Sequence, residues 1–150
     1  MSQVRSRQQR QDDARAKLAK DQDVWVATAH DGQSHLVPLS LAWNGTEVVV
    51  AAEITSRTAR NVIAGGSVRL ALGDPRDVVM VDVTARVVSC SEASDELRNG
   101  YAERTGWNPA SESADFVFLC LRPDRIQVWN NLLEIKDRTI MKNGEWLAAE

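Results

Sequence analysis

The chain has 150 residues, of which 43% are hydrophobic and 26% are charged, and its formal net charge at pH 7 is −3. This composition is typical of one globular domain with a sizeable core, and the mild negative charge gives no general reason to bind nucleic acid or an anionic membrane. Because no apolar run could cross a bilayer and the stretch MSQVRSRQQRQ lacks the apolar centre of a secretory signal, we expect a cytoplasmic protein.

The N-terminal segment is basic: residues 1–20 carry six Lys or Arg against two Asp, with Ala14, Leu18 and Ala19 on one helical stripe. We predict a surface helix within residues 1–22, frayed at its start and part of the same domain as residues 23–150. Its charges are expected to face solvent. A nucleic-acid-binding arm is the other interpretation, but no aromatic side chains are interleaved to stack on bases.

From Val24 the pattern changes to strands. VWVATAH (24–30), the turn Asp31-Gly32 and HLVPLSLAW (35–43) indicate a hairpin, and Asn44-Gly45 leads into TEVVVAAE (46–53). These three strands predict an antiparallel meander. SVRLALG and VVMVDVTARVVS indicate two more strands, separated by the turn-forming Asp74-Pro75.

Two helices are predicted beside these strands. Thr55 or Ser56 can cap a helix over residues 56–64 that ends at Gly65-Gly66, and a second helix lies within SEASDELRNGYAERTG (91–106), weakened by Gly100. DFVFLCLRP, DRIQVWN and a closing stretch through Trp146 follow. This order predicts a mainly β (α+β) fold, a closed or partly closed antiparallel barrel with peripheral helices.

Arg57 and Arg60 are expected in the first turn of the helix that Ser56 begins. The N-terminus of a helix is electropositive, so each cation there costs roughly 0.3–1 kcal/mol. A bound anion would make this arrangement favourable, whereas plain surface solvation of the two arginines is the alternative.

The cysteines and histidines indicate no reactive centre. Cys90 and Cys120 lie in or beside predicted strands, and a buried pair of reduced thiols is expected because cytosolic disulfides are rare. The only two histidines, His30 and His35, lack ligand spacing to a Cys or carboxylate cluster, so no metal site is predicted.

Three blocks of the chain, in this order, resemble the pyridoxamine 5′-phosphate oxidase-like split β-barrel superfamily of FMN- and deazaflavin-dependent oxidoreductases. VWVATAHDGQSHLVPLSLAWNG (24–45) is similar to the family's opening hairpin with its Val-Pro-rich second strand. VVVAAEITSRTARNV (48–62) is similar to the strand-then-helix element that grips the cofactor phosphate. RPDRIQVW (122–129), followed by Asp137-Arg138, looks like the closing motif.

The resemblance implies a homodimeric antiparallel split β-barrel with peripheral helices and two cofactor sites at the subunit interface. Ser56, Arg57 and Arg60 would bind the cofactor phosphate, and Asn61 would cap locally or support an arginine. Trp129 and Arg138 would approach the ring, in the family often from the partner subunit. The expected cofactor-binding residues are His35, Val37, Pro38, Ser40, Ala52, Ser56, Arg57, Arg60, Asn61, Trp129 and Arg138.

Other interpretations of these residues stay open. Trp129 is also expected as a core aromatic, and Arg138 as half of a surface pair with Asp137 or Glu134. The sequence departs from the family at Thr58, where many members have a lysine, and it lacks the oxidase's Tyr-Arg-Ser cluster for the substrate phosphate. Oxidation of pyridoxamine phosphate itself is therefore not expected.

The implied function is an FMN- or deazaflavin (F420)-dependent oxidoreductase that passes hydride between the ring and a small conjugated substrate. FMN is the expected cofactor and F420 the alternative. The alternative function is a non-catalytic flavin- or haem-binding dimeric split barrel. Haem would need an axial ligand, for which only His30 and His35 are available.

Overall fold

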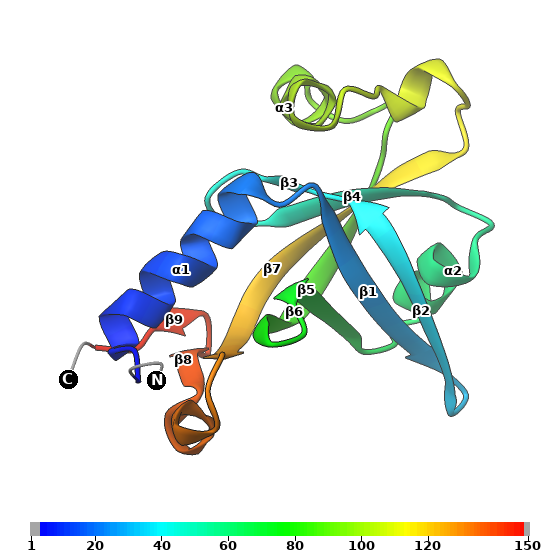
Figure 1. Ribbon diagram of the computed structural model, residues 1–150. Coiled ribbons are helices and arrows are strands. Elements are labelled where there is room, and N and C mark those ends of the chain that lie inside the picture. Colours follow the sequence, from blue (N-terminus) through cyan, green and yellow to red (C-terminus); the bar gives the residue numbers. More distant parts are fainter. Residues whose placement is uncertain (1–3, 149–150) are drawn as a thin grey trace.

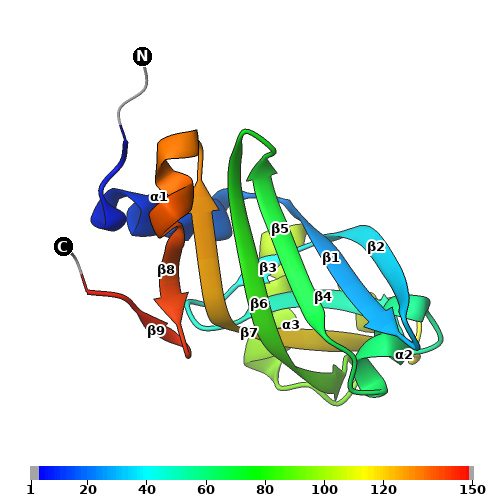
Figure 2. The same cartoon turned by 90° about the horizontal axis from the view of Figure 1, so that it is seen from below.

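The computed structural model describes residues 4–148, in which one nine-stranded antiparallel sheet carries three α-helices around it (Figures 1 and 2). The first three residues of the predicted segment 1–22 and the last two of the segment 23–150 lie outside this range. The elements are, in chain order, α1 (Arg7–Lys20), β1 (Asp23–His30), β2 (Gln33–Ser40), β3 (Ala42–Trp43), β4 (Val48–Glu53), α2 (Arg57–Ile63), β5 (Val68–Asp74), β6 (Asp77–Ser89), α3 (Asp95–Thr105), the 3₁₀ helix η1 (Pro109–Ser111), β7 (Phe116–Trp129), the 3₁₀ helix η2 (Leu132–Asp137), β8 (Thr139–Lys142) and β9 (Glu145–Trp146).

The sheet curls because its longest strand, β7, changes neighbours along its length. The strand order is β2-β1-β5-β6-β7-β4-β3, and β7 pairs with β4 at its start and with β8 at its end. The register with β6 shifts at Asp82 and Val83, which face Arg125 and Pro123 and leave Asp124 unpaired. This bulge accommodates a proline within one 14-residue strand, where the sequence indicated two.

The predicted meander of the first three strands is wrong. β2 is an edge strand paired with β1, whereas β4 pairs with β7 and with the short β3. The chain bends at Leu41, whose buried side chain interrupts the run that the sequence presents as one strand. The mainly β class and the antiparallel arrangement with peripheral helices are confirmed.

The main core lies on the concave side of the sheet and is covered by α1. Ala14 and Leu18 of α1 are fully buried against strand residues such as Val26 and Leu119. Ala19, expected on the same stripe, is exposed, and Arg10 is buried in its place. The expectation that the charges of this helix face solvent is therefore wrong for Arg10.

A second, smaller core lies between α3 and the other side of the sheet, and it includes Phe118, Tyr101 and both cysteines. The helix predicted within residues 91–106 is confirmed: Ser94 caps α3 by accepting a hydrogen bond from the Leu97 N–H at 3.2 Å, and Gly106 ends it in the left-handed conformation. Within residues 4–148, no helix combines the length and the apolar character needed to cross a bilayer.

Candidate functional site

Two hollows adjoin α3, and Tyr101 lines both of them. The larger, which we call the β2–α2 hollow, has a volume of about 730 Å³ and lies between β2, the end of β4, the start of α2 and the segment after α3. Six of the eleven residues predicted to bind a cofactor line it: His35, Val37, Pro38, Ser40, Ala52 and Ser56. The fold therefore brings residues from three separate elements to one concave surface.

An aromatic wall that the sequence did not reveal closes one side of the β2–α2 hollow. Tyr101, Trp107 and Phe116 line it, and the Trp107 ring centroid lies 6.3 Å from that of Tyr101 and 5.2 Å from that of Phe116. The Tyr101 hydroxyl donates to the Ser40 carbonyl at 3.3 Å, and burial raises the pKa of the phenol to about 12. The chain has only eight aromatic residues, and three of them line this hollow. Their scarcity was the signal by which the sequence could have singled them out.

The start of α2 offers hydrogen-bond donors at the edge of this hollow. Ser56 caps the helix, accepting from the Ala59 N–H at 3.1 Å, so its own hydroxyl hydrogen is left to donate outward. Within residues 4–148 the N–H groups of Arg57 and Thr58 have no acceptor. An anion at this edge would meet these three donors.

The two arginines of α2 differ in position. Arg57 is the first residue of this seven-residue helix, and Arg60 is its fourth, at the point where the first and last turns meet. A cation in the last turn is electrostatically favourable, which leaves Arg57 as the unusual charge. Both side chains are exposed, neither lines the β2–α2 hollow although Ser56 and Thr58 do, and neither has an ion-pair partner in the described part of the chain.

Asn61 has a structural role. The prediction that it caps the helix locally or supports an arginine is wrong. Its side chain is buried, and the amide donates to the Thr28 hydroxyl at 3.0 Å. This bond ties α2 to β1, and so fixes the helix whose start borders the hollow.

Trp129 and Arg138 pair with each other far from the β2–α2 hollow. The Arg138 guanidinium carbon lies 6.0 Å from the Trp129 ring centroid, and Nη1 donates to the Ile135 carbonyl at 2.8 Å. The alternative pair with Glu134 is wrong, because that carboxylate binds Arg5. Phe116 and Trp129 begin and end β7, which places them about 40 Å apart along the strand at ~3.3 Å per residue.

The remaining titratable groups do not suggest a nucleophile or a metal centre. Cys90 and Cys120 are free and fully buried, as predicted, and burial raises their thiol pKa values to about 12 and about 11. In the region that the structure describes, no cluster of three or more His, Cys, Asp or Glu residues could hold a metal ion. Asp23 and Glu53 also line the β2–α2 hollow and make its own charge negative.

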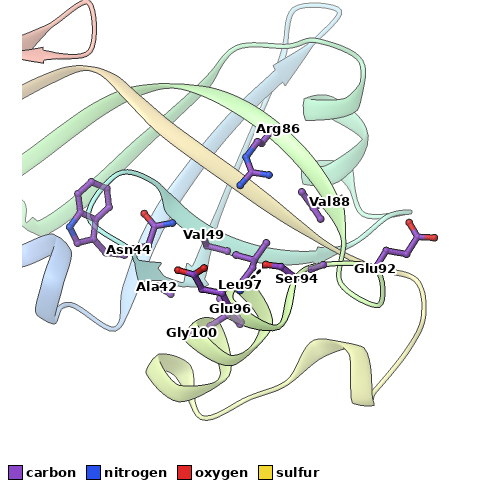
Figure 3. A pocket seen from close by; sticks show the side chains of 13 residues that line it. Ala42, Asn44, Val49, Arg86, Val88, Glu92, Ser94, Glu96, Leu97 and Gly100 are labelled. Carbon is purple, nitrogen blue, oxygen red and sulfur yellow. Dashed lines mark hydrogen bonds between the residues drawn. The ribbon is translucent and has the colours of Figure 1, made fainter.

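The second hollow, of about 540 Å³, lies between α3 and the strands β3, β4 and β6 (Figure 3). Val49, Val88 and Leu97 contribute apolar side chains to its lining, and Arg86 and Glu96 contribute charged ones. The Arg86 guanidinium is held by two 3.0 Å hydrogen bonds to Glu47. The predicted cofactor residues all lie outside this hollow.

Comparison with solved structures shows a shared fold. An F420 reductase aligns with a TM-score of 0.61 and 21% identity over 74% of this chain and 93% of that one. A putative pyridoxamine 5′-phosphate oxidase from Listeria innocua aligns with a TM-score of 0.66 and 16% identity, over 80% of this chain and 98% of that one. HutZ, described as the heme storage protein from Vibrio cholerae, aligns with a TM-score of 0.66 and 19% identity, over 79% of this chain and 94% of that one.

A comparison with curated protein sequences gives no match. The family model described as pyridoxamine 5′-phosphate oxidase matches residues 11–130, well over half of the chain. This match includes β1 to β7, and with them the β2–α2 hollow. The chain therefore belongs to the pyridoxamine 5′-phosphate oxidase family and has its split β-barrel fold.

Proposed function

We propose that this protein is a flavin- or deazaflavin-dependent oxidoreductase that binds its cofactor in the β2–α2 hollow, with FMN as the expected cofactor and F420 as the alternative. The observation that carries the proposal is the convergence of six expected residues, from β2, β4 and the start of α2, on one hollow of about 730 Å³. The F420 reductase among the structural neighbours supports the same reaction class. The free, buried cysteines agree with the cytoplasmic location that we propose.

The phosphate of the cofactor would lie at the start of α2. There the Ser56 hydroxyl and the N–H groups of Arg57 and Thr58 can donate hydrogen bonds to the phosphate oxygens. Arg57 supplies a positive charge and has no ion-pair partner within residues 4–148. Because α2 has only seven residues, these direct donors matter more than its dipole. Thr58 is buried where many family members have a lysine, so Arg57 carries most of the charge.

The ring would lie along β2, against Val37, Pro38 and the aromatic wall. When bound, FMN or F420 supplies the hydride chemistry, and the chain's residues orient it and exclude water. Ala52 is small and widens the hollow beside β2. His35 and Ser40 are the polar groups of β2 that can hydrogen-bond within it.

We further propose a homodimer in which Trp129 and Arg138 of one copy complete the hollow of the other. Within one chain the two groups of residues lie at opposite ends of β7. A two-fold pair would bring them together twice, giving two equivalent sites. An arginine near the pyrimidine side of a flavin would stabilise the reduced anion.

A non-catalytic cofactor-binding protein is the second candidate, and three observations favour it. The buried Thr58 removes a phosphate-binding cation, and Asp23 and Glu53 add negative charge to the hollow. HutZ, with the same fold, is described as a heme storage protein. Of the two histidines, His35 lines the hollow, so it would be the axial ligand if haem were bound.

Titration of the purified protein with FMN, F420 and haemin tests these alternatives. Arg57→Ala is expected to weaken FMN or F420 binding by about 1.5–3 kcal/mol, since one charge-assisted contact is lost. Arg76→Ala, which removes an exposed arginine between β5 and β6, is the control and should leave binding unchanged. Tight haemin binding that depends on His35, without flavin binding, would favour the second candidate.

A further inference from the structure

The second hollow, between α3 and the strands β3, β4 and β6, is a cavity that the proposed cofactor does not use (Figure 3). Its volume of about 540 Å³ lies within the range of roughly 300–1,000 Å³ that is usual for small-molecule sites. We propose that it binds a small ligand with an apolar body and one positive charge, independently of any cofactor in the β2–α2 hollow. Three features of its lining lead to this class of ligand: a core that is incompletely covered, a glycine that the fold does not require, and two carboxylates without partners.

Apolar side chains of the second core line this hollow from three elements. Val49 of β4 is 2% exposed, whereas Val88 of β6 and Leu97 of α3 pack against the same core and are only half-buried (Figure 3). Transfer of apolar surface out of water is favourable. The apolar body of a ligand placed here would therefore complete the burial of these side chains.

Gly100 lies in the middle of α3, where a glycine destabilises a helix relative to an alanine. The fold does not require it, because its φ is not positive and a Cβ there would meet no atom of residues 4–148 within 4 Å. Gly100 nevertheless lines the second hollow, and its missing side chain leaves the helix backbone open on that side. Close approach of a ligand to the backbone is a use of glycine that fits this position.

The charges in the lining determine the sign of the ligand. The Arg86 guanidinium is neutralised by Glu47 through the two 3.0 Å hydrogen bonds. Glu92 and Glu96 also line the hollow, and in the part of the chain that the structure describes neither carboxylate has an ion-pair or hydrogen-bond partner. Trp43 contributes an indole ring, which attracts cations. A cationic group is therefore favoured over an anionic one.

An NMR titration of the isotope-labelled protein tests the site with 4-phenylbutylamine as the probe. The matched control is 4-phenylbutyrate, which has the same apolar body and the opposite charge. We expect the amine to shift the amide signals of Val49, Val88 and Leu97 to saturation, and the acid to bind at least about tenfold more weakly. Glu96→Gln should weaken binding of the amine at least about threefold. Glu53→Gln, which changes a carboxylate that lines only the β2–α2 hollow, should leave it unchanged.

A second variant separates binding from folding at Gly100. Gly100→Leu should keep or raise the unfolding midpoint in denaturant, since leucine is a better helix former than glycine. The same change should weaken binding of the amine at least about tenfold, because the added side chain occupies the hollow. Asn99→Leu adds the same side chain at the neighbouring exposed position of α3, outside the lining, and should bind the amine as the wild type does.

The outcomes distinguish this site from the proposed cofactor site. Saturable binding that prefers the amine and is lost in Gly100→Leu would establish the site. The absence of saturable shifts, equal binding of the amine and the acid, or shifts confined to the β2–α2 hollow would each overturn the proposal. A protein that binds the amine in the second hollow but takes up neither FMN nor F420 would keep this site and lose the proposed function.

Discussion

Arg5 and Glu134 lie 129 positions apart in the sequence, and one guanidinium donates to both oxygens of one carboxylate, at 2.8 and 3.1 Å. Burial alone would raise the Glu134 pKa, but the hydrogen bonds from Arg5 and from the Asn130 N–H outweigh it and hold the pKa at about 2. The basic N-terminal segment thus stabilises the fold from within.

The first prediction concerns acid stability. The folded-state pKa of Glu134 lies below its usual 4.5, so its stabilisation is complete above about pH 4.5 and is lost as pH falls towards 2. The pKa difference corresponds to roughly 3 kcal/mol. In urea unfolding measured between pH 5 and 2.5, the wild type should lose stability more steeply than Glu134→Gln. Parallel curves would contradict this assignment.

The second prediction concerns the buried bond between Asn61 and Thr28. Asn61→Ala should lower the free energy of unfolding by about 1–3 kcal/mol, because it leaves the Thr28 hydroxyl buried without its partner. The double variant with Thr28→Val should cost less than the sum of the two single changes. Denaturant unfolding of the four proteins measures this coupling, and strict additivity would show that the bond contributes nothing.

The third prediction compares two glycines. A Cβ at Gly100, within α3, would meet no atom within 4 Å, so Gly100→Ala should stabilise the protein by about 0.5–1 kcal/mol. A Cβ at Gly66 would lie 2.1 Å from the Ala29 carbonyl oxygen, so Gly66→Ala should destabilise it. Thermal and denaturant unfolding distinguish the two signs, and destabilisation by Gly100→Ala would indicate a packing role for that position.

The fourth prediction concerns the thiols. Cys90 and Cys120 are fully buried with raised pKa values, so neither should react with a disulfide reagent such as DTNB at pH 8 while the protein is folded. Both should react at once in denaturant. Rapid labelling of the native protein would show that α3 opens from the sheet.

The sequence predicted the features that local pattern determines. The Ser56 cap, the helix end at Gly65-Gly66 and most strand positions depend on near neighbours, and they are confirmed. The six predicted residues that line the β2–α2 hollow belong to two contiguous blocks that resemble the family.

Long-range contacts account for most of what the sequence did not reveal. Trp107 joins the hollow only because α3 folds back over β4, and Arg10 is buried only because the connection between β7 and β8 packs beside α1. Neither side-chain chemistry nor spacing carries this information.

The central claim is that each cofactor site combines β2 and α2 of one copy with Trp129 and Arg138 of another. Subunit complementation tests it most directly, using Arg57→Ala and Arg138→Ala, each of which alone should weaken FMN or F420 binding by about 1.5–3 kcal/mol. After free subunit exchange in an equal mixture, about half of the dimers are mixed, and one of the two sites in each mixed dimer carries neither substitution. About one quarter of all sites should therefore bind at wild-type affinity. No recovery of binding in the mixture, from subunits shown to exchange, would contradict the account.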